Sequence, residues 1–145
     1  MNAHDAGVLQ KVMQWLSYAD DDLRLAQHAL ATMNSGCPYR LIAYHAHQCA
    51  EKCLKAYLVY HGIDFPYTHD ISKLLELCSE KASWAETIQD AEELTLYSTI
   101  TRYPGEGEEV TKEEAHRAIH IADNVRQVVR AAFTEEGVDL LIVTM

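Results

Sequence analysis

Residues 39–61 read YRLIAYHAHQCAEKCLKAYLVYH, and this stretch decides the fold class of the 145-residue chain. Small or apolar residues recur in it every three or four positions, which is the period of one face of an α-helix. We expect its most buried line to consist of Ala43, Ala46, Ala50, Cys53 and Tyr57. Gly62 stands where glycine commonly terminates a helix. The stretch therefore predicts a long helix with one face in the core.

The same period appears before and after this helix. Residues 9–30 carry a stripe over about six helical turns, which the segment Asn34-Ser-Gly-Cys-Pro38 interrupts. The stripe consists of Leu9, Val12, Leu16, Ala19, Leu23, Ala26 and Leu30. Thr111 and Glu114 have the spacing of a capping box, which predicts a last helix to about Phe133. Its expected core line is Ala115, Ala118, Ala122, Val125, Val129 and Ala132.

Two further helices are predicted between these segments. Thr68 or Asp70 can cap a short helix that runs to about residue 81. Ser83 with Glu86 has the spacing of another capping box, which predicts a fourth helix to about residue 101. The fold class predicted from these periods is all-α, an up-and-down antiparallel helical bundle of four to five helices. We assign residues 1–134 to the bundle and residues 135–145 to an apolar C-terminal tail.

Composition and charge exclude several classes of function. The 12 Lys and Arg residues face 22 Asp and Glu residues, for a net charge of −10. Such a chain repels a phosphate backbone at long range, so we expect no non-specific DNA binding. We find no apolar run near the roughly 20 residues of a membrane span and no secretory leader pattern, and we predict a cytoplasmic protein. The four cysteines contain no CxxC pair and are expected to be free, mostly buried thiols.

His45, Cys49 and Cys53 occupy successive i,i+4 positions and are candidate metal ligands. This spacing can place metal ligands on one side of a helix. The two cysteines also border the alanine-rich core face, however, and cysteine is among the most buried residue types. No carboxylate or second histidine stands at a companion spacing. We therefore predict no metal and no cofactor.

A polar stripe along the helix of residues 39–61 is a candidate surface for an anionic ligand. It holds Arg40, Gln48, Lys52 and Lys55, and Glu51 stands one turn before Lys55 as an i,i+4 ion-pair partner. Such a stripe is more often the solvated face of an amphipathic helix, with lysine stems covering apolar neighbours. Taken alone, the stripe favours that simpler interpretation.

Arg102-Tyr103-Pro104 ends the fourth predicted helix and is a candidate phosphate clamp. An arginine offers a planar fork suited to phosphate oxygens, here on a stiff turn beside an aromatic ring. The same arginine would also interact favourably with the helix dipole without any ligand. The local sequence does not separate the two interpretations.

Thr68-His69-Asp70 is a further candidate at the start of the third helix. First-turn amides attract anions, and histidine titrates near neutral pH, as a general acid or base must. Capping of the helix by Thr68 or Asp70, with His69 packed on the loop, explains these residues without a ligand. We favour capping.

Taken together, these landmarks resemble the HEPN domain family. The second predicted helix carries Ala46-His-Gln-Cys-Ala-Glu-Lys-Cys-Leu-Lys-Ala56, and the family's usual form is A-x-Q-x-A-E-K-x-L-K-A. The other matching pieces, in the same order as in the family, are Trp15 with Ala19, Asp22 and Leu23, then Thr68-His69-Asp70-Ile71, then Arg102-Tyr103-Pro104. The resemblance spans about residues 15–130.

The resemblance implies a helical bundle that forms a homodimer and has a nucleotide- or RNA-related role. It also implies a separate small nucleotidyltransferase as partner, in toxin–antitoxin-like pairs. Many family members are metal-independent ribonucleases with Arg-x(4–6)-His near the last two helices. This chain departs from that pattern, because the first histidine after Arg102 is His116. Arg40 with His45 or His47 matches the spacing, but on the wrong helix and at a rate expected by chance.

Two hypotheses follow, and a third concerns the tail. In the first, which we favour, the chain is a non-catalytic binding subunit, in which Arg102, Tyr103 and the polar stripe hold a nucleotide or a partner's phosphorylated end. In the second, it is a ribonuclease in which Arg102 stabilises developing charge and His69 or His116 moves a proton. In the third, it is a structural oligomer that uses the apolar tail 138–145 as its contact surface. In any of these cases we expect the tail to pack on a partner or a second subunit.

Overall fold

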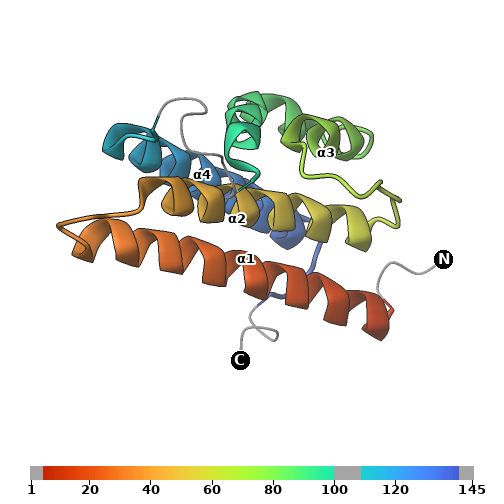
Figure 1. Cartoon of the computed structure of the whole chain (residues 1–145). Coiled ribbons are helices and arrows are strands. Elements are labelled where there is room, and N and C mark those ends of the chain that lie inside the picture. Colours follow the sequence, from red (N-terminus) through yellow and green to blue (C-terminus); the bar gives the residue numbers. More distant parts are fainter. Residues whose placement is uncertain (1–4, 100–108, 141–145) are drawn as a thin grey trace.

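The computed structural model describes residues 5–99 and 109–140, and within them every regular element is a helix (Figure 1). The elements are α1 (Ala6–Thr32), α2 (Tyr39–Tyr60), α3 (Ile71–Cys78), the 3-10 helix η1 (Ser83–Tyr97) and α4 (Lys112–Glu135). The predicted all-α bundle is confirmed. None of these helices is both long enough and apolar enough to cross a membrane.

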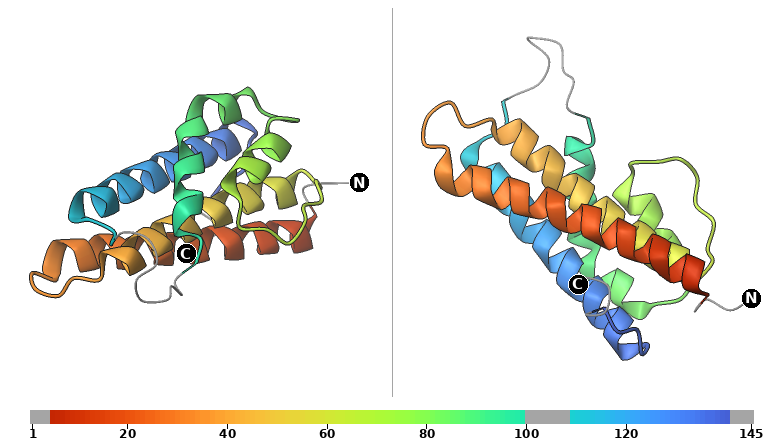
Figure 2. Two further views of the ribbon diagram at one scale, coloured as in Figure 1. Left: turned by 45° about the horizontal axis from the view of Figure 1, so that its top comes forward. Right: turned by 90° about the horizontal axis from the view of Figure 1, so that it is seen from below.

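Helix α2 lies at the centre of the bundle and contacts every other element. It pairs with α1 as a long antiparallel hairpin, and α4 packs on it from another side (Figures 1 and 2). α3 and η1 cover α2 on the face away from α1 and carry the chain back, so α4 begins at the same end of the molecule as α2 (Figures 1 and 2). A helix enclosed in this way must bury residues all round its circumference.

The predicted core lines are confirmed in all three long helices. In α2 the line Ala43, Ala46, Ala50, Cys53 and Tyr57 is buried, and Gly62 ends the helix at a φ of 65°. This left-handed conformation costs glycine little because it has no Cβ. The stripes predicted on α1 and α4 line the same core, with only Leu9 and Leu30 partly exposed at the ends of the α1 stripe. The small residues of α2 and α4 let their backbones approach closely.

The capping predictions were right at two helices and wrong at one. Asp70 caps α3 by accepting from the Ser72 amide at 2.9 Å. Thr111 and Glu114 form the complete capping box of α4, with reciprocal bonds of 2.9 and 3.1 Å. The box predicted at Ser83 does not form: Ala82 is the N-cap of η1, without a side-chain cap bond, and Ser83 is already inside the helix.

The segment after Ser83 also differs from a regular α-helix. It is a 3-10 helix with a kink at Ile88, where φ is −123° and ψ is 35°. Ala85, Ile88, Ala91 and Leu94 are nevertheless buried. The sequence therefore predicted a helix in this segment but not its tighter winding, because burial on the neighbouring helices overrides local propensity.

The capping box at Thr111, which forms, can be tested against the one predicted at Ser83, which does not form. Thr111→Ala removes the side-chain acceptor for the Glu114 amide, so we expect it to lower the free energy of unfolding by about 1 kcal/mol. Ser83→Ala is the matched control, because Ser83 forms no cap bond in η1. Urea denaturation of both variants measures the difference. Equal losses in the two variants would contradict the cap assignment.

Candidate functional site

One part of the predicted polar stripe of α2, Lys55 with its partner Glu51, lies inside the protein. Glu51 is only 3% exposed and Lys55 only 6% exposed. The Lys55 ammonium donates to Glu51 Oε2 at 2.9 Å and lies 5.7 Å from the ring centre of Trp15 and 5.6 Å from that of Phe65. The expected i,i+4 ion pair is confirmed, but the interpretation of this part as a solvated face is wrong. Phe65 of the loop before α3 and Trp15 of α1 lie against it.

Glu51 is the centre of this buried cluster. Its second carboxylate oxygen, Oε1, accepts from His69 Nδ1 at 2.8 Å. His69 is 39% exposed at its side chain, so it connects the buried carboxylate to the surface. A carboxylate taken out of water needs such partners, because an unpaired buried charge is strongly destabilising. Glu51 thus ties the loop before α3 to α2.

His47 is fully buried beside this cluster. Its Nε2 donates to the backbone carbonyl of His69 at 2.7 Å, and its Nδ1 lies 3.2 Å from the side-chain amide of the half-buried Gln48. Burial lowers the pKa of His47, because the charged imidazolium would lose its hydration there. The neutral ring serves as a hydrogen-bond donor that holds the same loop.

Lys52 and His45 converge on the first helix rather than on open solvent. Lys52 Nζ lies 2.5 Å from Asp22 Oδ2, and His45 Nδ1 donates to Asp22 Oδ1 at 2.8 Å. Cys49 and Cys53 are free and buried, and the bond to Cys53 together with burial raises the pKa of the Cys49 thiol. Within residues 5–99 and 109–140, no group of three His, Cys, Asp or Glu side chains is arranged to hold a metal ion.

The other predicted site residues are not brought to one place in the described chain. Arg102 and Tyr103 lie outside the described residues. His116 is exposed in the first turns of α4, and that end of α4 lies at the opposite end of the bundle from α3, which directly follows His69 (Figures 1 and 2). The structure therefore joins His69 and Lys55 through Glu51, and it separates His69 from His116.

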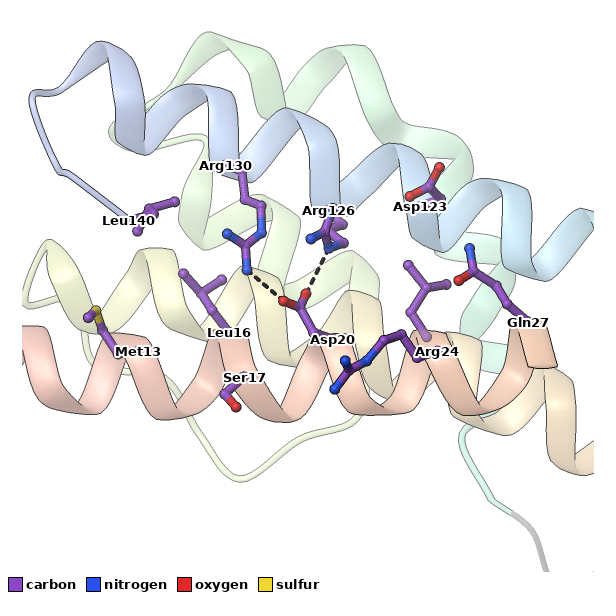
Figure 3. Close-up of a pocket in the computed structure, with 11 residues that line it drawn as sticks. Met13, Leu16, Ser17, Asp20, Arg24, Gln27, Asp123, Arg126, Arg130 and Leu140 are labelled. Carbon is purple, nitrogen blue, oxygen red and sulfur yellow. Dashed lines mark hydrogen bonds and ion pairs between the residues drawn. The ribbon is translucent and has the colours of Figure 1, made fainter. Parts of the chain in front are cut away.

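A second polar region, which the sequence reasoning missed, lies between α1 and α4. It is a cavity of about 680 Å³, and Figure 3 shows the side chains that line it. Asp20 on α1 accepts from Arg126 Nε at 2.7 Å and from Arg130 Nη2 at 2.8 Å, both on α4. We call this cavity the α1–α4 groove. Its bonds join residues more than 100 positions apart in the chain.

The groove is cationic in the middle and apolar at one end. Arg24 lines it as a third arginine, although its guanidinium bonds to Asp21, and Asp123 lines it from α4. Met13, Leu16 and Leu140 form the apolar end (Figure 3). The bond from Arg126 to Asp20 raises the pKa of Arg126 still further, so this arginine keeps its charge at any physiological pH.

Comparison with known proteins identifies the family. The HEPN domain family matches residues 12–132, which is most of the chain and includes α2 with its buried cluster. The chain belongs to the HEPN family. The resemblance noted in residues 46–56 is thereby confirmed.

The chain is also similar to one curated protein and to two solved structures. The chain is 31% identical over 138 residues to "Putative toxin MJ1304" of Methanocaldococcus jannaschii, covering 84% of this chain and 88% of the relative. The crystal structure of ST0689, an archaeal HEPN homologue, is similar with a TM-score of 0.65 and 30% identity, over 83% of this chain and 96% of that one. TT1696 from Thermus thermophilus gives a TM-score of 0.67 and 26% identity, over 84% and 98%. The fold described above is thus shared with a crystallised archaeal HEPN homologue and with TT1696.

The buried ion pair predicts non-additive losses of stability in this HEPN bundle. Glu51→Gln leaves the Lys55 ammonium buried without its counter-ion, and we expect a loss of about 3 kcal/mol in the free energy of unfolding. Adding Lys55→Met should recover part of the lost free energy of unfolding, because the double variant no longer buries an unpaired charge. Glu93→Gln is the control, because the ion pair of Glu93 with Arg117 is exposed and screened by solvent. Additive losses from Glu51→Gln and Lys55→Met in guanidinium denaturation would contradict this account.

His47 predicts a specific dependence of stability on pH. Its folded pKa is lowered, so the unfolded chain takes up a proton at His47 before the folded chain does. Stability from this group is therefore complete above its unfolded pKa of about 6.5 and decreases as the pH falls toward the folded pKa. We expect His47→Gln to lose less stability than the wild type between about pH 7.5 and pH 5.5.

Thermal unfolding at several pH values measures the slope of stability against pH. The control is His28→Gln, a substitution of an exposed histidine on α1, which should keep the slope of the wild type. An identical slope in His47→Gln and wild type would show that His47 is not the titrating group.

Proposed function

We propose that this chain is the binding subunit of a toxin–antitoxin-like pair. In this proposal it binds a nucleotide or the phosphorylated end of a partner, acts as a cytoplasmic homodimer with a separate small nucleotidyltransferase, and catalyses no reaction by itself. Membership of the HEPN family supports the general class. The name of the relative from Methanocaldococcus jannaschii supports a toxin-like system.

The separation of the two candidate histidines is the observation that favours binding over a ribonuclease that uses both histidines at one site. His69 is bonded through Nδ1 to the buried Glu51, and His116 lies in the first turns of α4, at the other end of the bundle (Figure 1). Cleavage of RNA through its 2′-hydroxyl requires a proton to be removed and another to be supplied at one site. A single copy of the chain does not offer both histidines to one substrate.

The alternative function is a metal-independent ribonuclease, and one contact favours it. A carboxylate bonded to one ring nitrogen of a partly exposed histidine is the arrangement by which enzymes orient a general base, and Glu51 and His69 have it at 2.8 Å. Arg102 would then stabilise the charge that develops on the phosphorus oxygens. The contact has a structural explanation as well, because Glu51 also neutralises Lys55.

Cleavage and binding assays separate the two functions. We expect the purified chain not to cleave RNA in excess EDTA. We expect it to bind a fluorescent ATP analogue, and Arg102→Ala to weaken that binding by about tenfold, the effect of losing one charge-assisted contact. Arg117→Ala, which removes an exposed arginine bonded to Glu93, is the control. EDTA-resistant cleavage that disappears in both Arg102→Ala and His69→Ala would establish the ribonuclease and overturn the proposal.

A further inference from the structure

We infer that the α1–α4 groove binds a nucleoside phosphate, with the phosphate on Arg126 and Arg130 and the base at the apolar end. This inference rests on the proposed nucleotide binding and adds to Arg102 two phosphate-binding arginines that the sequence motifs did not indicate. Asp20 occupies the same guanidinium groups in the structure, so it would compete with the phosphate for them.

The size and shape of the groove fit this ligand class. Its volume of about 680 Å³ lies within the range of about 300–1,000 Å³ that is typical of small-molecule pockets. Met13, Leu16 and Leu140 provide an apolar wall at one end, and the arginines lie farther along the groove (Figure 3). A nucleoside phosphate has the same two parts, an apolar ring system and an anionic group a few ångströms away.

The charge of the groove is opposite to that of the protein. Three arginines and two aspartates line it, which gives a local sum of 3 − 2 = +1 in a chain with a net charge of −10. Each of the three is paired with a carboxylate, Arg24 with Asp21 and the other two with Asp20, so a phosphate would bind by competing with these carboxylates. The surrounding negative field also disfavours long polyanions, which favours a small phosphate ligand over extended nucleic acid.

The two arginines of α4 retain donors for such an anion. A guanidinium has five N–H donors, and each arginine uses one nitrogen toward Asp20, its ion-pair partner among the described residues. Arg130 Nε is buried and bonds to none of the described residues. Because Arg126 and Arg130 are one helical turn apart on the same face of α4, their forks converge on one point, which Asp20 marks in Figure 3.

Substituting Asp20 distinguishes a phosphate site from a purely structural ion pair. If the arginines only tie α1 to α4, Asp20→Asn lowers stability and creates no affinity for anions. If the groove is a phosphate site, the same substitution removes the competing carboxylate and tightens binding. The two interpretations therefore predict opposite results from one variant.

The test is isothermal titration calorimetry with ATP in EDTA, on the full chain and four variants. We expect Arg126→Gln and Arg130→Gln each to weaken ATP binding by about tenfold or more, since each removes a charge-assisted contact. Asp20→Asn should tighten it severalfold. Arg117→Gln is the matched control, because Arg117 is on the same helix and bonded to a carboxylate, but it is exposed and outside the groove.

Each outcome decides between the groove and the wider proposal. If the wild type binds ATP and the two groove variants bind it as tightly as Arg117→Gln does, the groove assignment is overturned and nucleotide binding elsewhere stands. If the wild type does not bind ATP, both proposals fail. Circular dichroism of each variant identifies unfolding, and if Asp20→Asn is unfolded, the comparison of the arginine variants with Arg117→Gln still decides.

Discussion

The structure depends on how a helix at the centre of the bundle keeps a charged pair out of water. α2 contacts every other element, so Glu51 and Lys55 are buried on it together with its alanines. The pair is tolerated because Lys55 neutralises one carboxylate oxygen and His69 bonds to the other. The bond to His69 holds the loop before α3 on α2, and α3 and η1 pack on α2 themselves.

This constraint also decides where ligands can be bound. Lys52 is paired with Asp22 and Lys55 with Glu51, so the cations of the α2 stripe are already engaged within the chain. The arginines of α4 are also paired, but they face a cavity large enough for a small molecule. An anion can reach them by displacing one carboxylate, Asp20, without opening the core.

Most of the fold could be predicted from the sequence, because helical periodicity reports burial directly. The core lines of α1, α2 and α4 were predicted residue by residue, and so were the caps at Asp70 and Thr111. The capping box at Ser83 failed because tertiary packing winds that segment as a 3-10 helix that begins one residue early. The Lys55 error has a similar cause: a helical arc shows which residues share a face, but not what later covers that face.

The candidate site was less predictable, because its contacts join distant segments. Arg126 and Arg130 have i,i+4 spacing, and Asp20-Asp-Asp22 is a conspicuous acidic run, but nothing local links residues 106 positions apart.

The most direct measurement is NMR of the arginine Nε–H groups during titration with ATP. The account predicts that the Arg126 and Arg130 signals shift together and saturate, while that of Arg117 does not move. Saturable shifts confined to the α2 cluster around His69 would contradict it.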